Sequence, residues 1–302
     1  MQKEFYSNGK LLLSGEYAIL DGALGFAIPT SYGQSLHVTP TNTGFLEWTS
    51  FDEEKKQWFS ASFNLDNFEI KSTTDQSIAQ SLITILLEAN AQNPFLLTES
   101  RGFKVETHLD FPRSWGLGTS STLINNLAQW ARVDAYELLW NAFGGSGYDI
   151  ACAQHNIPIT YQLKNGRAKV EEIQFNPIFK DSLFFVHLNQ KQSSKEAIEA
   201  YHNLSIDKEK LIKDISAITQ KMILADTLAG FERLMEEHEA LLSEILQIAP
   251  IKQRLFPDYF GAVKSLGAWG GDFVLATGDF KSLDYFKDKG YHTAIPYAKM
   301  EL

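Results

Sequence analysis

The feature that most constrains the fold is a loop of small residues between a strand pattern and a helix pattern. Apolar and polar side chains alternate over residues 103–111, as in a half-buried β-strand, and Pro112 closes this strand. Residues 116–121 read Gly-Leu-Gly-Thr-Ser-Ser, and helical spacing follows from Thr122 to Arg132. A strand, a glycine loop and a helix in this order leave free backbone N–H groups at the helix start.

The other patterns indicate an α+β protein, with strands and helices segregated along the chain. We expect strands near residues 10–14, 35–39, 45–51, 57–63, 158–163, 167–173, 182–188, 273–277 and 291–296. We expect helices over residues 78–89, 135–143 and 280–287, and several between 194 and 249. The pattern changes near residue 178, and 302 residues suffice for two domains, so we expect domains of residues 1–178 and 179–302.

Composition and charge narrow the class of protein. Hydrophobic residues make up 44% and charged residues 21%, which is ordinary for a globular chain, and the single cysteine, Cys152, excludes an internal disulfide. The formal charge of −10 argues against nucleic acid as a partner, although a few local Lys and Arg side chains can still bind a small anion. No apolar run has signal-peptide length or approaches the roughly 20 residues of a membrane span. We therefore expect a cytoplasmic protein without membrane contact.

The loop Gly116–Ser121 is the first candidate site. Glycines let a ligand approach the backbone closely, and free N–H groups at a helix start favour an anion such as a phosphate chain. The alternative is an ordinary glycine turn that caps a helix. The segment is neither a Walker-A loop, because no Lys follows Gly118, nor a G-x-G-x-x-G fingerprint.

A second glycine segment, residues 144–149, ends in Asp149. A carboxylate after a flexible loop can orient an attacking hydroxyl and accept its proton. The alternative is an Asp that only caps a helix beginning at Ile150.

Two further segments combine glycine with charge. Lys10 opens an apolar run that ends in Gly15-Glu16, so both charges could face one pocket; the alternative is a surface Lys and an exposed Glu. Residues 266–272 place glycines before the apolar strand 273–277, where the backbone could close over a phosphate; the alternative is an ordinary turn.

Taken in their order along the chain, the four segments resemble the GHMP kinases. This family includes galactokinase, homoserine kinase, mevalonate kinase and phosphomevalonate kinase. Lys10–Gly22 is similar to the K-x-x-L-x-G-E-[HY]-A-x-[LV] motif of the mevalonate and phosphomevalonate kinases, and Tyr17 leans toward the phosphomevalonate branch. Residues 112–122 resemble the P-x-x-x-G-L-G-S-S-A phosphate loop, with Thr119 for the first Ser and Thr122 for the Ala.

The other two matches complete the set. Residues 145–149 resemble the G-S-G-x-D segment that carries the catalytic Asp. Residues 266–271 are similar to the third motif, G-A-G-G-G, with Trp269 in place of a Gly. Each match is weak alone, whereas their order over most of the chain is specific.

The resemblance implies an N-terminal α/β domain that binds ATP, a C-terminal ferredoxin-like α+β sandwich, and an acceptor in the cleft between them. The ATP-binding residues would be Gly116, Leu117, Gly118, Thr119, Ser120 and Ser121. Asp149 would align the acceptor hydroxyl or take its proton, and Lys10 would pair with Asp149. The acceptor-binding residues would be Glu16, Tyr17, Ser146, Gly147, Lys195, Gly267 and Gly270.

Mg²⁺ would be held by Thr119 or Ser120, and Glu137 is the candidate for the family's metal-ligating Glu. Glu137 can equally be a solvated helix residue. Only 28 residues separate Gly118 from Ser146, so one helical element of the family layout is missing. Arg113, Lys191 and Lys264 are further cations for an anionic substrate, with solvated surface side chains as the alternative.

The predicted function is ATP-dependent phosphoryl transfer to a small molecule, most simply mevalonate or phosphomevalonate, by a monomer or homodimer. Alternatives within the enzymes are another GHMP acceptor, such as a sugar or homoserine, and a decarboxylase of the diphosphomevalonate type. A non-catalytic ATP-binding relative is a different class. The retention of both Lys10 and Asp149 speaks against that last alternative.

Overall fold

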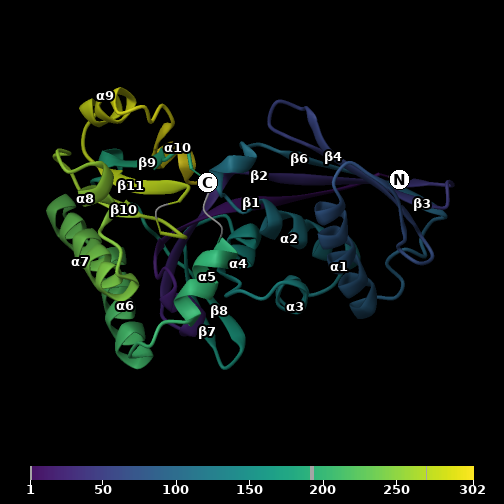
Figure 1. The fold of residues 1–302 in the computed structure, drawn as a ribbon, viewed down its shortest axis with the longest axis horizontal. Helices are drawn as coiled ribbons and strands as arrows, with labels where there is room; N and C mark the ends of the chain where they lie inside the picture. Colours follow the sequence, from purple (N-terminus) through teal and green to yellow (C-terminus); the bar gives the residue numbers. More distant parts are fainter. Residues whose placement is uncertain (1, 191–193, 270) are drawn as a thin grey trace. The chain divides into compact units, whose positions relative to one another are not determined.

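Two long strands, β1 (Lys3–Ser14) and β2 (Gly25–Thr41), pass through both units into which the chain divides. The computed structural model describes residues 2–190, 194–269 and 271–302, with the backbone alone at 194 and 195 (Figure 1). The first unit comprises the residues up to Gly9, Tyr32–Arg113 and Leu117–Gln154. The second comprises Lys10–Ser31, Ser114–Gly116 and the residues from His155 onward.

This division differs from the expected domains of residues 1–178 and 179–302. Residues 10–31 and 155–178 lie in the same unit as the C-terminal part of the chain. The reason is strand pairing: β7 (Ile159–Lys164) pairs with the first residues of β2 and with β8 (Arg167–Glu172). Composition along the chain carries no signal for such an interleaved division.

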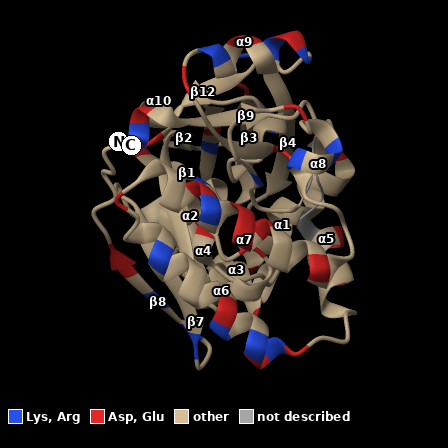
Figure 2. Cartoon of the chain, turned by 90° about the vertical axis from the view of Figure 1, so that its left-hand side faces the viewer, with Lys and Arg blue, Asp and Glu red and all other residues tan. Residues whose placement is uncertain are grey.

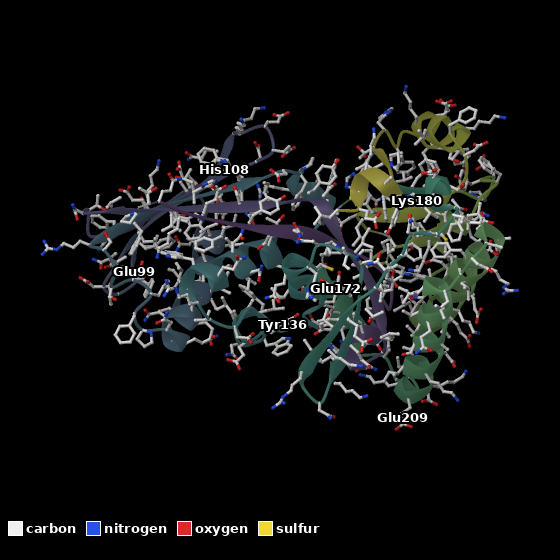
Figure 3. The ribbon with its side chains drawn as sticks, turned by 180° about the vertical axis from the view of Figure 1, so that it is seen from behind. Glu99, His108, Tyr136, Glu172, Lys180 and Glu209 are labelled. Atoms are coloured by element: carbon white, nitrogen blue, oxygen red, sulfur yellow. The ribbon has the colours of Figure 1, made fainter. Side chains whose placement is uncertain are left out.

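The first unit is a mixed sheet with helices packed on one face. Its strands follow the order β5 (Ile70–Thr73), β4 (Gln57–Asn64), β3 (Phe45–Phe51), β6 (Gly102–Leu109) and then residues 34–41 of β2. The helices are α1 (Gln76–Gln92), α2 (Thr119–Ala131), α3 (Ala135–Ala142) and α4 (Tyr148–Gln154). In Figure 3, His108 and Tyr136 lie on opposite sides of this sheet. The alternation of residues along β6 therefore separates a helix-covered face from a polar one.

Several expected elements of this unit are confirmed. The hairpin of residues 45–51 and 57–63 forms, and the predicted helix 78–89 lies within α1. Asp134 caps α3 by accepting hydrogen bonds from the N–H groups of Tyr136 and Glu137. Helix α2 begins at Thr119, three residues before the apolar spacing starts, because its first turn carries the small hydroxyl residues of the loop.

The second unit contains an antiparallel sheet in the order β10 (Val263–Ser265), β11 (Phe273–Thr277), β9 (Leu183–His187) and β12 (Ala294–Pro296). Helices α6 (Lys208–Ile223) and α7 (Leu228–Leu246) connect β9 to β10, and α9 (Lys281–Asp288) connects β11 to β12. A β-α-β-β-α-β chain with this strand order is ferredoxin-like, as expected for the C-terminal part.

Shorter elements complete the second unit. They are α5 (Ser194–His202), α8 (Ile251–Leu255), α10 (Tyr297–Met300) and the 3₁₀ turns η1 (Ala18–Asp21) and η3 (Lys180–Ser182). A third 3₁₀ turn, η2 (Arg113–Trp115), precedes the glycine loop. The Asn165-Gly166 hairpin between β7 and β8 is confirmed, with φ of 51° and 71° at its two central residues, as a type I′ turn requires.

Basic and acidic residues are interspersed along α6 and α9 (Figure 2). Within residues 2–190, 194–269 and 271–302, no helix combines the length and the apolarity that a membrane span requires.

The core of the first unit fixes the position of α2, and a pair of leucine variants tests this. Leu127 on α2 is fully buried, whereas Leu87 on α1 is 49% exposed. Leu127→Ala should lower the free energy of unfolding by about 2–5 kcal/mol because it opens a cavity. Leu87→Ala should change it by about 0.5 kcal/mol or less. Urea denaturation measures both, and equal losses would contradict this assignment of the core.

Candidate active site

The glycine loop leads into an α2 N-terminus that no side chain caps. Gly116 and Gly118 have φ of 64° and 96°, in the left-handed region that favours glycine. Gly118 is the N-cap residue and makes no side-chain hydrogen bond to the helix. Thr119 is half-buried and Ser120 is exposed. A glycine N-cap offers no side-chain acceptor to the first amides of α2, which is the arrangement that favours an anion.

Buried hydroxyl groups hold this loop from inside the first unit. Ser121 is 2% exposed, and its hydroxyl donates to the carbonyl of Gly118 at 2.9 Å. The Thr122 hydroxyl donates to Gln34 Oε1 at 2.8 Å. Leu117 is fully buried and anchors the loop in the core. Of the six predicted ATP-binding residues, Leu117 and Ser121 thus have inward side chains and offer a ligand only backbone atoms.

In the second unit, Lys10 lies beside the start of the same loop. Its Nζ donates to the carbonyl of Gly116 at 2.8 Å. A Cβ atom at Gly116 would lie 1.9 Å from Asp272 Oδ2, so only glycine fits there. Trp115 packs edge-on against Phe273 with ring centroids 5.7 Å apart. These contacts join the predicted Lys10 to Gly116, the one loop residue that belongs to the second unit.

Asp149 lies in the first turn of α4 in the first unit. It is half-buried, and its Oδ1 accepts from the N–H of Ile150 at 3.1 Å. Helix α4 is tied to α2, because Asn125 Nδ2 donates to the Ala153 carbonyl and Gln154 Nε2 donates to Asn125 Oδ1. Asp149 and the start of α2 therefore belong to one packed helix pair. Lys10 belongs to the other unit, and its pairing with Asp149 stays a prediction.

The loop before α4 has the conformation that its sequence suggests. Gly144, Gly145 and Gly147 all have positive φ, and Ser146 and Gly147 are buried. In the third glycine segment, Gly267 has φ of 64°. Gly270 and Lys191 lie outside the described residues, as does the side chain of Lys195, so these predicted contacts stay predictions.

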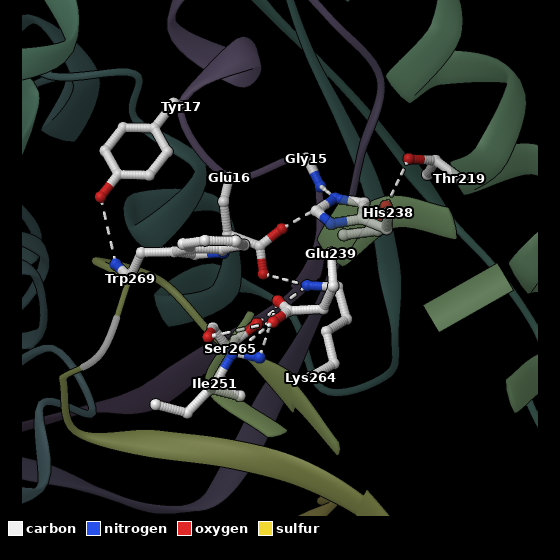
Figure 4. A network of polar contacts seen from close by, with 11 residues as sticks. Gly15, Glu16, Tyr17, Thr219, His238, Glu239, Ile251, Lys264, Ser265 and Trp269 are labelled. Carbon is white, nitrogen blue, oxygen red and sulfur yellow. Dashed lines mark hydrogen bonds and ion pairs between the residues drawn. The ribbon is translucent and has the colours of Figure 1, made fainter. Parts of the chain in front are cut away.

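The second unit buries a cluster of charged groups next to the N-terminal motif (Figure 4). The side chains of Glu16, Lys264 and His238 are each 0% exposed. Lys264 Nζ forms an ion pair with Glu16 Oε1 and also donates to the Ser265 carbonyl at 2.9 Å. His238 Nε2 lies 3.1 Å from Glu16 Oε2 and 3.3 Å from the amide nitrogen of Gly15. Because one ring nitrogen cannot donate to the first and accept from the second at once, these two contacts alternate with the tautomer.

These surroundings change the ionisation of the cluster. Burial alone would raise the pKa of Glu16, but Lys264 and then His238 outweigh it and lower the pKa to about 2. Burial, followed by Lys264, lowers the pKa of His238, so the imidazole is neutral at pH 7. Lys264 was expected among the cations available to a substrate. The structure corrects this, because the ammonium group is wholly buried and pairs with Glu16.

Glu239 is a second buried carboxyl in the cluster. It is 3% exposed and accepts hydrogen bonds from the N–H groups of Ser265 at 3.0 Å and Ile251 at 3.2 Å. Burial raises its pKa to about 7, against the lowering effects of Lys264 and the two amides. Glu239 therefore changes its charge near neutral pH inside the protein.

Sequence reasoning missed His238 and Glu239, although a signal for His238 existed. Phe231, Leu234, Met235, His238 and Leu242 are all buried and follow one face of α7. A histidine within such an apolar stripe is buried, and a buried imidazole requires a polar partner.

Tyr17 has an unusual backbone conformation. Its φ of 61° and ψ of −53°, together with an Ala18 N–H to Glu16 carbonyl bond of 2.7 Å, define a classic γ-turn. Such strain costs on the order of 1–3 kcal/mol and clusters at functional sites. The Tyr17 hydroxyl accepts from the N–H of Trp269 at 3.1 Å, which links the first motif to the third.

Trp269 fills apolar space that a glycine would leave open. It is 4% exposed and packs in one cluster with Tyr17, Tyr201 and Leu242. The Tyr201 hydroxyl donates to Asp21 at 2.6 Å, which ties α5 to the η1 turn. Trp269, which replaces a glycine of the family motif, is therefore a packing residue in the core of the second unit.

Comparisons of the structure with solved proteins agree with this arrangement. The mevalonate kinase of Methanococcus jannaschii is 17% identical, with a TM-score of 0.64 over 96% of this chain and 95% of that one. The phosphomevalonate kinase of Streptococcus pneumoniae, solved with phosphomevalonate and AMPPNP, is 16% identical, with a TM-score of 0.67 over 99% and 98%. The galactokinase of Lactococcus lactis, solved with galactose, is 15% identical, with a TM-score of 0.67 over 95% and 88%. This chain has the GHMP kinase fold.

At these identities the likeness establishes the fold, and the acceptor stays open. No family model and no curated protein matches the sequence.

The residues present fit a magnesium ion only in part. Thr119 and Ser120 offer hydroxyl groups at the start of α2, whereas Glu137 is exposed in the first turn of α3. The described part of the chain contains no group of three or more His, Cys, Asp or Glu side chains that could hold a metal. Because Mg²⁺ keeps waters and binds largely through substrate phosphates in kinases, this donor set suits an ion that arrives with a nucleotide.

The buried carboxyl groups predict a specific dependence of stability on pH. The pKa of Glu239 rises from 4.5 to about 7 on folding, so the folded state binds its proton more tightly. This contribution to stability is fully present below pH 4.5 and is lost as the pH rises through 7, by roughly 3 kcal/mol. Glu16 has the opposite effect on stability, and at lower pH. Its stabilising contribution is lost as the pH falls from 4.5 toward 2.

Glu239→Gln should therefore remove most of the loss of stability between pH 4.5 and 7. Denaturation measured at several pH values for wild type and variant gives the difference directly. Glu244→Gln, at an exposed position of the same helix, is the control and should leave the profile unchanged. Parallel profiles for wild type and Glu239→Gln would show that Glu239 titrates normally in the folded protein.

Proposed function

We propose that this protein is an ATP-dependent small-molecule kinase that transfers the γ-phosphoryl group to a hydroxyl or phosphate of its acceptor. The observation that carries the proposal is the glycine N-cap of α2, in a GHMP kinase fold. Lys10, bonded to the carbonyl of Gly116, is in keeping with it. We expect it to act in the cytoplasm as a monomer or homodimer.

In this proposal the amides of Gly118, Thr119 and Ser120 bind the phosphate chain of ATP. The helix dipole adds to their attraction for the anion. Mg²⁺, held by the phosphates with Thr119 or Ser120 and with Glu137 as the candidate carboxylate, would neutralise charge on the transferred group. Because Gly116 has no Cβ atom, the protein backbone can pass Asp272 at this point without a clash.

Asp149 and Lys10 would act on the acceptor. The Asp149 carboxylate orients the acceptor hydroxyl and takes its proton as the oxygen attacks the γ-phosphorus in line, and ADP leaves. Lys10 stabilises negative charge on the reacting oxygens from its position beside Gly116. No covalent enzyme intermediate is needed, because positioning and electrostatics suffice for this transfer.

The acceptor we favour is mevalonate or phosphomevalonate. The Tyr17 motif and the likeness to mevalonate and phosphomevalonate kinases support this choice. Tyr17, Ser146, Gly147 and Gly267 would contact the acceptor, and Lys195 and Gly270 stay proposed contacts. Glu16 is buried behind this turn, so its contribution to acceptor binding would be indirect.

Other acceptors have support of the same kind. The likeness to a galactokinase, with a TM-score of 0.67, favours a sugar as the second candidate. Homoserine, decarboxylation of the diphosphomevalonate type and binding of ATP without turnover are the further alternatives.

An ADP-release assay with Mg-ATP tests the proposal against mevalonate, phosphomevalonate, galactose, homoserine and no acceptor. We expect turnover with mevalonate or phosphomevalonate and none without an acceptor. Turnover with galactose or homoserine would keep the reaction and replace the acceptor. Release of CO₂ would identify a decarboxylase. ATP binding without turnover on the full panel would favour the non-catalytic relative.

Asp149→Asn tests the proposed role of the carboxylate. It should lower kcat by on the order of 10²- to 10⁴-fold, because the amide cannot accept the proton. Affinity for ATP, measured by calorimetry, should be unchanged. Asp66→Asn, at an exposed turn of the same unit, is the matched control and should retain full activity. Near-wild-type turnover by Asp149→Asn would remove Asp149 from the chemistry.

A further inference from the structure

The strained turn at Tyr17 requires restraint from outside the turn. A large residue with φ of 61° and ψ of −53° relaxes to another conformation unless its surroundings hold it in place. The Tyr17 ring packs on Tyr201 with centroids 5.3 Å apart, and this contact acts on the side chain rather than on the backbone torsions. The restraint therefore has to act on the residues next to Tyr17.

The neighbouring residue, Glu16, supplies that restraint. Its carboxylate is held by Lys264 on one oxygen and faces His238 at 3.1 Å on the other. All three side chains are 0% exposed, so no water competes for these contacts. Figure 4 shows Glu16 lying between Tyr17 and the Lys264–His238 pair. The carboxylate is thus fixed within one residue of the strained φ.

Lys264 is a rigid anchor for this purpose. It lies in the middle of β10, and β10 pairs with β11 through Val263, Lys264 and Ser265. Its ammonium group also donates to the Ser265 carbonyl at 2.9 Å, which limits its rotation. An apolar side chain would fill this position in a core at lower desolvation cost, so the ion pair adds direction rather than stability.

The restraint extends from Tyr17 to the third glycine segment. The N–H of Trp269 donates to the Tyr17 hydroxyl at 3.1 Å, and Trp269 is four residues after Ser265. Two contacts, Lys264–Glu16 and Trp269–Tyr17, therefore link residues 15–22 to residues 263–269, and we place both segments beside the acceptor in the proposed reaction.

We propose that Lys264 is a positioning residue for the acceptor: by fixing Glu16 it holds the turn at Tyr17, and through Tyr17 it sets the segment at Trp269. The inference rests on the proposed kinase function for its link to an acceptor. Lys264 does not touch the acceptor and takes no part in the chemical step.

Three variants separate positioning from simple stabilisation. Lys264→Met removes the charge and leaves Glu16 buried without its ion-pair partner. Glu16→Gln combined with Lys264→Met removes both charges and keeps similar volumes, so it folds even where the single variant does not. Lys264→Arg keeps the charge and can restore the pair. Lys289→Met is the control, because it deletes a lysine from an exposed ion pair with Asp258 in the same unit.

Hydrogen exchange read by mass spectrometry is the first measurement, since it needs no substrate. The amides of Ala18 and Trp269 donate bonds that define the turn and its link, so peptides covering residues 15–22 and 263–269 report on them. In the double variant these peptides should exchange on the order of tenfold faster or more, while the β9 strand stays protected. In Lys264→Arg and Lys289→Met, the exchange rates of both peptides should lie closer to the wild-type rates than those of the double variant do.

Steady-state kinetics then connects the turn to the acceptor. The double variant should raise KM for the acceptor by on the order of tenfold, with KM for ATP unchanged, because only the acceptor segments move. If Lys264 had a purely structural role, the double variant would have a lower melting temperature. Its ratio of KM for the acceptor to KM for ATP would then equal that of the wild type.

The outcomes are distinct. Unchanged exchange of both peptides in the folded double variant would overturn the proposal, as would a rise in both KM values together. Faster local exchange with a selective rise in acceptor KM supports it. Failure of the wild-type protein to turn over any acceptor would count against the kinase function, and the exchange result would still decide whether Lys264 holds the turn.

Discussion

The ion pair of Glu16 with Lys264 is the interaction on which the arrangement of the second unit depends. It joins the segment after β1 to β10, and His238 and Glu239 bring α7 to the same point. Four ionisable side chains share this volume, and three of them are wholly buried. Removing Lys264 or Glu16 alone leaves an uncompensated charge in a low dielectric, so these two side chains stabilise the cluster only as a pair.

The glycine loop obeys a different physical rule. Its proposed role depends on exposed backbone: the N-cap of α2 is Gly118, which has no side chain to cap the helix, and a Cβ at Gly116 would meet Asp272. The hydroxyl groups of Ser121 and Thr122 point inward and fix the loop from below. A ligand would thus meet backbone amides on a rigid support, which preorganises them without a conformational cost.

Trp269 combines a buried packing contact with a position in a glycine segment. In the family motif a glycine occupies this position, and here an indole fills the cluster with Tyr17, Tyr201 and Leu242. The unit thereby exchanges backbone freedom for packing next to the proposed acceptor site.

Local sequence determined much of what the structure contains. The hairpin at Asn165-Gly166, the Asp134 cap and helix α1 follow from turn chemistry and from the spacing of apolar residues. The glycine loop and Asp149 were identifiable for the same reason, since each is a contiguous segment whose residues lie on one short stretch of backbone. The ferredoxin-like order of the C-terminal elements was implied by the family resemblance, not by spacing.

The tertiary structure decided the rest. Lys264 and Glu16 are 248 residues apart, and nothing near either one in the sequence distinguishes a buried pair from two surface charges. The division into units likewise depends on the pairing of β7 with β2, a contact between distant strands. Spacing along a chain determines which face of an element is apolar, whereas the partner that covers this face, and hence which charges become buried, is set only when the elements pack.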